Sequence, residues 1–230
     1  MAAGARPLPS TREEEALWAS GLRLVAGVDE VGRGPLAGPV YAAAVVLDPC
    51  AAPAWIADVR DSKVLTAAER ERLADLIRAE ALAYGIGWAT VGEIDGWGIT
   101  LANRMAMARA LAALPVRPQY VLIDGPSGIK TPHPQRAIVD GDATCASIAA
   151  ASIVAKVARD AVMCALDGLY PEYGFAGHKG YATREHLERL ARYGASPQHR
   201  RSWPRVQMAA RGLIPGDNDS TGGEEALAAR

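Results

Sequence analysis

The chain has 230 residues, 25 basic against 26 acidic side chains and a hydrophobic fraction of 50%, which fits an ordinary globular protein with one generous core. Three scattered cysteines, Cys50, Cys145 and Cys164, exclude a disulfide scaffold and offer no CxxC pair for a zinc ribbon. The apolar runs are far shorter than the ~20 residues that span a bilayer, so we expect no membrane anchor. The scattered cysteines suit a reducing, cytoplasmic location.

Charge is distributed unevenly along the chain. Residues 178–205 hold seven Lys/Arg against two Glu, a net charge of +5, whereas residues 216–230 carry four acids against one Arg, a net of −3. We expect a folded domain over residues 23–215 that includes the basic C-terminal part. Residues 216–230 are predicted to be a disordered acidic tail. Residues 1–22 are predicted to be a flexible extension, in which residues 11–18 could form a helical turn or two.

The first half of the chain predicts strands and one helix. Apolar segments at residues 24–28 and 40–47 read as strands on either side of the Gly/Pro-rich stretch 32–39. Residues 66–83 have helical periodicity and start with Thr66 and Glu69 in the spacing of a capping box. Residues 84–91 alternate in side-chain character from one position to the next, which predicts a third strand.

The second half predicts alternating helices and strands. Helices are expected at residues 99–114, 144–169 and 183–192, and short strands at residues 120–123 and 137–139. Together with the early strands, this order predicts an α/β fold with a mixed sheet and helices on its faces. The classical dinucleotide-binding fold is not favoured.

Carboxylates gather where predicted strands end. Asp29 and Glu30 close the first strand, Asp124 closes the strand 120–123, and Asp142 precedes the long helix. Each has a structural alternative: Asp29 and Glu30 as a solvated strand end, Asp124 as a turn residue before a glycine, and Asp142 as a helix-capping acid. Several hard oxygen ligands without a matching His or Cys set favour Mg²⁺ or Mn²⁺ over zinc, and phosphodiester hydrolysis is the natural use.

The Gly-Arg-Gly sequence at Gly32, Arg33 and Gly34 leads into a strand rather than a helix, so it is not the dinucleotide fingerprint. We interpret it as backbone held open for close approach by a ligand. Tyr181 is either a recognition aromatic or a ring packed at a helix entrance. His178 is interpreted as a phosphate contact or a loop hydrogen bond rather than a catalytic group.

Six motifs, in one order, resemble those of ribonuclease HII, the type 2 ribonuclease H family. The first, Asp29 to Val40, reads DEVGRGPLAGPV, and the others read DSKVL, IDG, GD, AASIVAKVARD and HKGYAT. The likeness covers about residues 24–206. Each short motif would be weak evidence alone, but their common order makes coincidence improbable.

The resemblance implies a ribonuclease H-like fold: a five-stranded mixed sheet flanked by helices, with a C-terminal helical extension. It implies an endonuclease that cuts the RNA strand of RNA–DNA hybrids. This activity includes cleavage on the 5′ side of a ribonucleotide embedded in duplex DNA by a two-metal mechanism that leaves 3′-hydroxyl and 5′-phosphate ends, as in the removal of ribonucleotides and RNA primers. Asp29, Glu30, Asp124 and Asp142 match the family's four metal-binding acids.

The resemblance also implies substrate contacts. The Gly32, Arg33 and Gly34 backbone would read the ribose 2′-hydroxyl, and Tyr181 would stack on the neighbouring sugar. Basic side chains would contact phosphates, namely Lys63, Lys179, Arg184, Arg200 and Arg201. The expected partners are the RNA–DNA hybrid and ribonucleotide-containing duplex DNA, and the expected state is a monomer. Two alternatives stay open: a non-catalytic module that binds hybrids and a metal-dependent small-molecule phosphohydrolase.

Overall fold

The computed structural model describes residues 8–51, 53–60 and 62–213, and it contains a single five-stranded mixed sheet in the order β3-β2-β1-β4-β5. The strands are β1 (Val25–Val31), β2 (Val40–Val46), β3 (Ala83–Ala89), β4 (Tyr120–Asp124) and β5 (Gln135–Ile138). Strands β1 to β3 pair antiparallel, and β1, β4 and β5 pair parallel. The sheet predicted from the sequence is confirmed.

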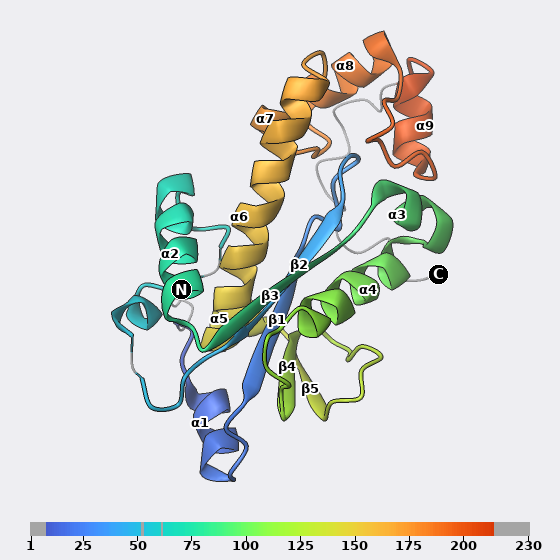
Figure 1. Ribbon diagram of the computed structural model, residues 1–230. Helices are drawn as coiled ribbons and strands as arrows, with labels where there is room; N and C mark the ends of the chain where they lie inside the picture. The colour runs from blue at the N-terminus through green and yellow to red at the C-terminus, as the bar shows by residue number, and fades with distance from the viewer. Residues whose placement is uncertain (1–7, 52, 61, 214–230) are drawn as a thin grey trace, which may run out of the picture.

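Helices cover both faces of this sheet (Figure 1). Helix α4 (Ile99–Ala112) packs on one face, and α6 (Ala146–Leu169) with α2 (Ala67–Glu80) packs on the other. The layers approach closely because Gly27 has no side chain: a Cβ there would lie 2.3 Å from the backbone of Ser147 on α6. The predicted capping box of α2 is present, with Thr66 and Glu69 bonded reciprocally.

Helix α6 runs along the sheet and extends beyond it to a smaller helical part (Figure 1). This part contains α7 (Phe175–His178), α8 (Arg184–Tyr193) and α9 (Pro204–Ala210). Its small core includes Leu36 from the Gly/Pro-rich segment, packed with Leu187, Leu190 and Val206. The helical part is therefore packed against the segment that follows Asp29 and Glu30. It is the C-terminal helical extension that the resemblance implies.

Shorter elements complete the fold. They are α1 (Arg12–Ala19), the 3₁₀ turn η1 (Ala54–Ala57), α3 (Val91–Trp97) and α5 (Gly141–Thr144). Helix α3 starts where the sequence predicts the end of the third strand, because Thr90 caps the helix through a capping box with Glu93. Within the described ranges, no helix has the length and apolar character needed to cross a bilayer.

The expectation of a flexible extension is wrong for the described residues 8–22, whereas the helical turn or two suggested for residues 11–18 is present as α1. Helix α1 docks through Glu14, which is completely buried. Its carboxylate accepts hydrogen bonds from the Ser147 backbone N–H at 2.7 Å and from the Cys145 thiol at 3.1 Å. Glu14 thus caps the N-terminus of α6 from outside that helix, where a negative charge is favoured. The predicted acidic tail lies outside the described residues.

We expect Glu14→Ala to lower the free energy of unfolding by about 2 kcal/mol, because it leaves a buried helix N–H without an acceptor. Chemical denaturation measures this change. Glu71→Ala, at an exposed position of α2, is the control and should change the free energy by less than about 0.5 kcal/mol. Equal effects of the two substitutions would show that α1 does not cap α6.

Candidate metal centre and nucleic-acid interface

Three carboxylates meet where β1 and β4 end. These strands are parallel neighbours with Val28 beside Ile123, so Asp29 and Asp124 follow at the same edge of the sheet. Asp29, Glu30 and Asp124 each offer an oxygen, and these three atoms lie within 4.8 Å of one another. The structure therefore brings together three of the four acids that the sequence singles out.

Asp29 and Glu30 are adjacent in a strand, so their side chains start toward opposite faces of the sheet. Residues on different helices act on them. Ser152 on α6 favours the ionised form of Asp29 and Asn103 on α4 that of Glu30, which opposes part of the rise in pKa that burial causes in both carboxyls. The Glu30 backbone N–H also donates to Asp29 Oδ1 at 2.6 Å. Both side chains are thus held near Asp124, a convergence that strand alternation alone would not give.

Electrostatics favours a cation among these groups. Burial raises the pKa of Asp29 well above its usual range, and the neighbouring charges of Glu30 and Asp124 raise it further. Burial also raises the pKa of Glu30 and of Asp124. A divalent cation would remove this repulsion and replace the lost hydration, and carboxylate oxygens are the ligands that Mg²⁺ and Mn²⁺ prefer.

Asp142 lies beside this group in α5 rather than within it. The backbone N–H groups of Gly141 and Asp142 donate to Asp124 Oδ1 at 2.8 and 3.3 Å. The Asp142 carboxylate lies 4.0 Å from Lys63 Nζ. The start of α5 thereby orients Asp124, and Asp142 is placed next to the three carboxylates on the side of Lys63.

The Gly-Arg-Gly segment follows Glu30 directly. Gly32 has φ +91°, a conformation that favours glycine, and a Cβ there would lie 2.2 Å from Arg159 Nε. Gly34 has no other atom within 4 Å of a Cβ position, so one face of its backbone is open. The Arg33 guanidinium pairs with Glu30 at 3.2 Å and is 55% exposed. The segment therefore presents backbone beside the carboxylates.

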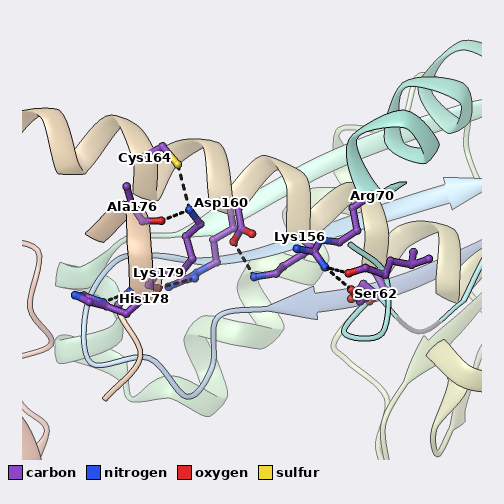
Figure 2. A network of polar contacts seen from close by, with 12 residues as sticks. Ser62, Arg70, Lys156, Asp160, Cys164, Ala176, His178 and Lys179 are labelled. Carbon is purple, nitrogen blue, oxygen red and sulfur yellow. Dashed lines mark hydrogen bonds and ion pairs between the residues drawn. The ribbon is translucent and has the colours of Figure 1, made fainter. Parts of the chain in front are cut away.

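Lys63 lies at the edge of the same site. The preceding residue is fixed at two points: Ser62 Oγ bonds Ser152 Oγ at 3.0 Å, and Arg70 donates to the Ser62 carbonyl at 2.9 Å (Figure 2). The Lys63 side chain itself is 80% exposed. Its backbone is thus held while its ammonium group is accessible to an anion.

The predicted contacts of the helical part differ in exposure. Tyr181 is 43% exposed, and Arg184 pairs with Glu188 on the surface of α8. Lys179 Nζ donates to the Ala176 carbonyl and lies 3.2 Å from Cys164 Sγ (Figure 2). The surface side chains of Tyr181, Lys179 and Arg184 are in positions that a long ligand could reach.

The expected phosphate contact of Arg200 is wrong. Its side chain is completely buried and donates to the backbone carbonyls of Gly32, Arg33 and Gly38. The basic run in the sequence therefore mixes surface cations with a structural one. Arg201 also bonds a backbone carbonyl, that of Ala195 at 3.0 Å.

A buried histidine cluster beside Tyr181 has no counterpart in the sequence interpretation. The His199 Nδ1 accepts the Ser196 N–H, so its Nε2–H donates to His186 Nε2 at 3.0 Å. The His186 Nδ1–H then donates to the Tyr181 carbonyl at 2.8 Å. His178 stacks on His186 at 4.2 Å and accepts the Gly180 N–H, which agrees with its predicted loop hydrogen bond. The cluster supports the backbone that carries Tyr181.

His186 and His199 stay neutral in the folded protein at neutral pH. Burial lowers the pKa of His186 to about 4 and that of His199 to about 3. As pH falls below about 6.5, the unfolded chain takes up protons on these two histidines and the folded chain does not. The two histidines therefore lower the free energy of unfolding as pH falls. The raised pKa values of Asp29, Glu30 and Asp124 change the stability in the opposite direction as pH falls. The contribution of the histidines is therefore measured by comparing the wild type with a histidine variant.

We expect the destabilisation caused by His199→Gln at pH 7.5 to shrink by about 3 kcal/mol at pH 4.5, because the glutamine cannot take up a proton. Denaturant unfolding of both proteins at several pH values measures this difference. A destabilisation that is independent of pH would contradict the neutral cluster.

Comparison with known proteins agrees with this geometry. The family model described as "Ribonuclease HII" matches residues 26–206. A relative of that name from Desulfitobacterium hafniense (strain DSM 10664 / DCB-2) is 53% identical over 86% of this chain and 75% of its own length. Another, from Moorella thermoacetica, is 55% identical over 83% of this chain and 91% of its own length. The crystal structure of the ribonuclease H2 from Pyrococcus horikoshii is 30% identical, with a TM-score of 0.69, and covers 82% of this chain and 98% of the other.

Proposed function

This chain belongs to the ribonuclease HII family, a family of metal-dependent endoribonucleases, and we propose that it hydrolyses the RNA strand of RNA–DNA hybrids and cuts 5′ of ribonucleotides embedded in duplex DNA. The observation that supports this proposal most strongly is the group of three carboxylates, one buried and two partly buried, beside an open glycine backbone. The carboxylates suit metal-dependent phosphodiester hydrolysis, and the adjacent glycine backbone suits recognition of a ribose.

The family uses divalent metal ions, and the acids of this chain suit them. We propose that Asp29, Glu30 and Asp124 hold Mg²⁺ or Mn²⁺, with Asp142 as the fourth ligand. When bound, such ions activate the attacking water and stabilise the leaving 3′-oxygen. The chain's own part is to orient the acids: the Glu30 N–H bonds Asp29, Arg33 pairs with Glu30, and the start of α5 bonds Asp124.

Recognition of RNA requires a contact to the 2′-hydroxyl, which only ribose carries. We propose that the backbone of Gly32, Arg33 and Gly34 makes this contact, since the open face of Gly34 lets a sugar approach within hydrogen-bonding distance. The exposed ring of Tyr181 would stack on the neighbouring sugar. Basic side chains would bind phosphates on either side: Lys63, Lys179 and Arg184.

The alternatives predict different behaviour. A hybrid-binding module without catalysis needs no acid cluster, yet all four carboxylates are retained. A small-molecule phosphohydrolase needs neither an exposed aromatic nor surface cations on the helical part. A duplex DNA with one ribonucleotide, the matching all-DNA duplex and a free ribonucleotide distinguish the three. We expect cleavage of the first alone, with 3′-hydroxyl and 5′-phosphate ends. Binding without cleavage, or hydrolysis of the free nucleotide alone, would contradict the proposal.

We expect Tyr181→Ala to lower kcat/KM at a single ribonucleotide by about tenfold, because loss of one stacking contact costs ~1–3 kcal/mol. Metal binding, followed by calorimetry, should not change. Tyr193→Ala, at another exposed tyrosine of the helical part, is the control. Unchanged kinetics in Tyr181→Ala would mean that this ring only packs.

We further propose that the protein acts as a monomer in the cytoplasm. In agreement with a reducing compartment, Cys50, Cys145 and Cys164 are all free thiols. Light scattering should give the mass of one chain, 24.2 kDa. A stable mass of twice that value would contradict the monomer.

A further inference from the structure

Two completely buried arginines surround the glycine-rich segment 32–39. They are Arg159 on α6 and Arg200 before α9. Neither forms an ion pair in the part of the chain that the structure describes. Burying a charge without a counterion costs several kcal/mol unless hydrogen bonds compensate, so the arrangement demands specific acceptors. These acceptors turn out to be backbone carbonyls.

Arg200 fastens both ends of a short loop. It donates to the carbonyl of Gly38 from Nε at 3.1 Å and from Nη2 at 3.0 Å. It also donates to the carbonyl of Arg33 at 2.7 Å and to that of Gly32. One guanidinium group therefore sets the path of the backbone from Gly32 to Gly38. Its planar fork of five N–H groups makes this possible, whereas a lysine ammonium would reach fewer acceptors.

Arg159 joins the same loop to the segment that carries Tyr181. It donates to the carbonyls of Ala37 at 3.2 Å and Pro39 at 3.0 Å, and to that of Lys179 at 3.0 Å. A second link runs directly between the two segments, from the Leu36 N–H to the Gly180 carbonyl at 2.8 Å. The Gly32 to Gly34 backbone and the Tyr181 ring are thus parts of one interlocked unit.

The same contacts that compensate the buried charges also fix the backbone of the loop. Burial lowers the pKa of both groups; that of Arg200 falls to about 9, so Arg200 stays charged at neutral pH. Their charge strengthens each hydrogen bond to a carbonyl. Recognition of a single hydroxyl depends on the placement of donors and acceptors, and a displacement of about 1 Å is costly.

We propose that Arg159 and Arg200 are positioning residues for ribonucleotide recognition, holding the Gly32 to Gly34 backbone at a fixed distance from Tyr181 without touching the substrate. This inference rests on the proposed roles of that backbone and of Tyr181. It predicts that the arginines determine the preference for a ribonucleotide rather than the affinity for duplex DNA in general.

The test measures binding by fluorescence anisotropy in an Asp124→Asn background, which prevents cleavage. The probes are a DNA duplex with one ribonucleotide and the matching all-DNA duplex. We expect Arg159→Lys and Arg200→Lys each to raise the Kd for the first probe about tenfold and to leave the Kd for the second unchanged. Arg192→Lys, at an exposed position of α8, should change neither value. A purely structural defect lowers the active fraction for both probes alike and leaves their ratio intact.

Gly34→Ala separates this inference from the proposed function. The added Cβ meets no other protein atom, so the fold should persist, and the methyl group should block the sugar. The preference for a ribonucleotide is the Kd for the all-DNA duplex divided by the Kd for the ribonucleotide duplex. If Gly34→Ala leaves this ratio unchanged, the proposed role of the loop fails and the inference with it. If Gly34→Ala lowers the ratio but Arg159→Lys and Arg200→Lys do not, only the positioning role is overturned. Loss of folding in both arginine variants would likewise assign them a structural role.

When Gly34→Ala is combined with Arg200→Lys, the loss of affinity for the ribonucleotide probe should be smaller than the sum of the two single losses, because both substitutions act on one contact. Full additivity would show that Arg200 acts elsewhere and would overturn its assignment.

Discussion

Asp124→Asn should reduce cleavage of a ribonucleotide-containing duplex by about a thousandfold or more while the protein stays folded. The substitution removes one charge from a site whose chemistry depends on metal-held oxygens. The side-chain oxygen that accepts the Gly141 N–H is retained in asparagine, so the start of α5 should keep its place. Single-turnover cleavage measures the rate, and circular dichroism checks the fold.

The same substitution should stabilise the metal-free protein at pH 7. The pKa of Asp124 is raised in the folded state, chiefly by burial, so folding opposes its ionisation. This penalty is absent below the unfolded pKa, near pH 4, and develops as pH rises through the folded pKa. The gain in melting temperature should therefore vanish near pH 3.

Asp140→Asn is the matched control for Asp124→Asn. Asp140 is a neighbouring acid with φ +52°, a conformation that asparagine tolerates. Cleavage by this variant should remain near that of the wild type. Equal losses of activity in the two variants would show that general negative charge, rather than the Asp124 ligand position, supports catalysis.

Asp142→Asn and Asp160→Asn should have opposite effects on activity and stability. Asp142 lies beside Asp124, and its loss should slow cleavage by about a hundredfold with little change in melting temperature. Asp160 lies about 20 Å along α6 from the start of that helix, and a metal pair spans only ~4 Å. It pairs with Lys156 at 2.8 Å (Figure 2), so its loss should cost about 0.5 kcal/mol of stability and leave cleavage unchanged.

Cleavage rates and melting temperatures of these two variants decide between the acids. The reverse pattern, with slow cleavage in Asp160→Asn and normal cleavage in Asp142→Asn, would mean that the wrong carboxylate is assigned as the fourth ligand.

Local signals made much of the fold predictable from the sequence. The capping box at Thr66 fixes the start of α2 within a few residues, and short apolar segments mark β1, β2 and β4. Asp29, Glu30 and Asp124 could be singled out because they stand at strand ends, where parallel strands share an edge. The third strand ends early for a local reason too, since the Thr90 capping box competes with its last residues.

Contacts between distant residues were not predictable. Glu14 and Ser147 are separated by 133 positions, so no local pattern shows that α1 caps α6. Arg200 looks like the other cations of its basic run, and only its contact with Gly38, 162 positions away, gives it a buried role. Ser152 and Asn103, on helices that cover opposite faces of the sheet, favour the ionised forms of Asp29 and Glu30, and this too depends on distant residues.

The metal dependence of cleavage tests most directly the claim that Asp29, Glu30 and Asp124 form a metal centre for phosphodiester hydrolysis. The measurement is the cleavage rate on a DNA duplex with one ribonucleotide, first in EDTA and then with increasing Mg²⁺ or Mn²⁺. We expect no cleavage in EDTA, recovery that saturates with the metal, and a single cut on the 5′ side of the ribonucleotide. Undiminished cleavage in EDTA would contradict the account.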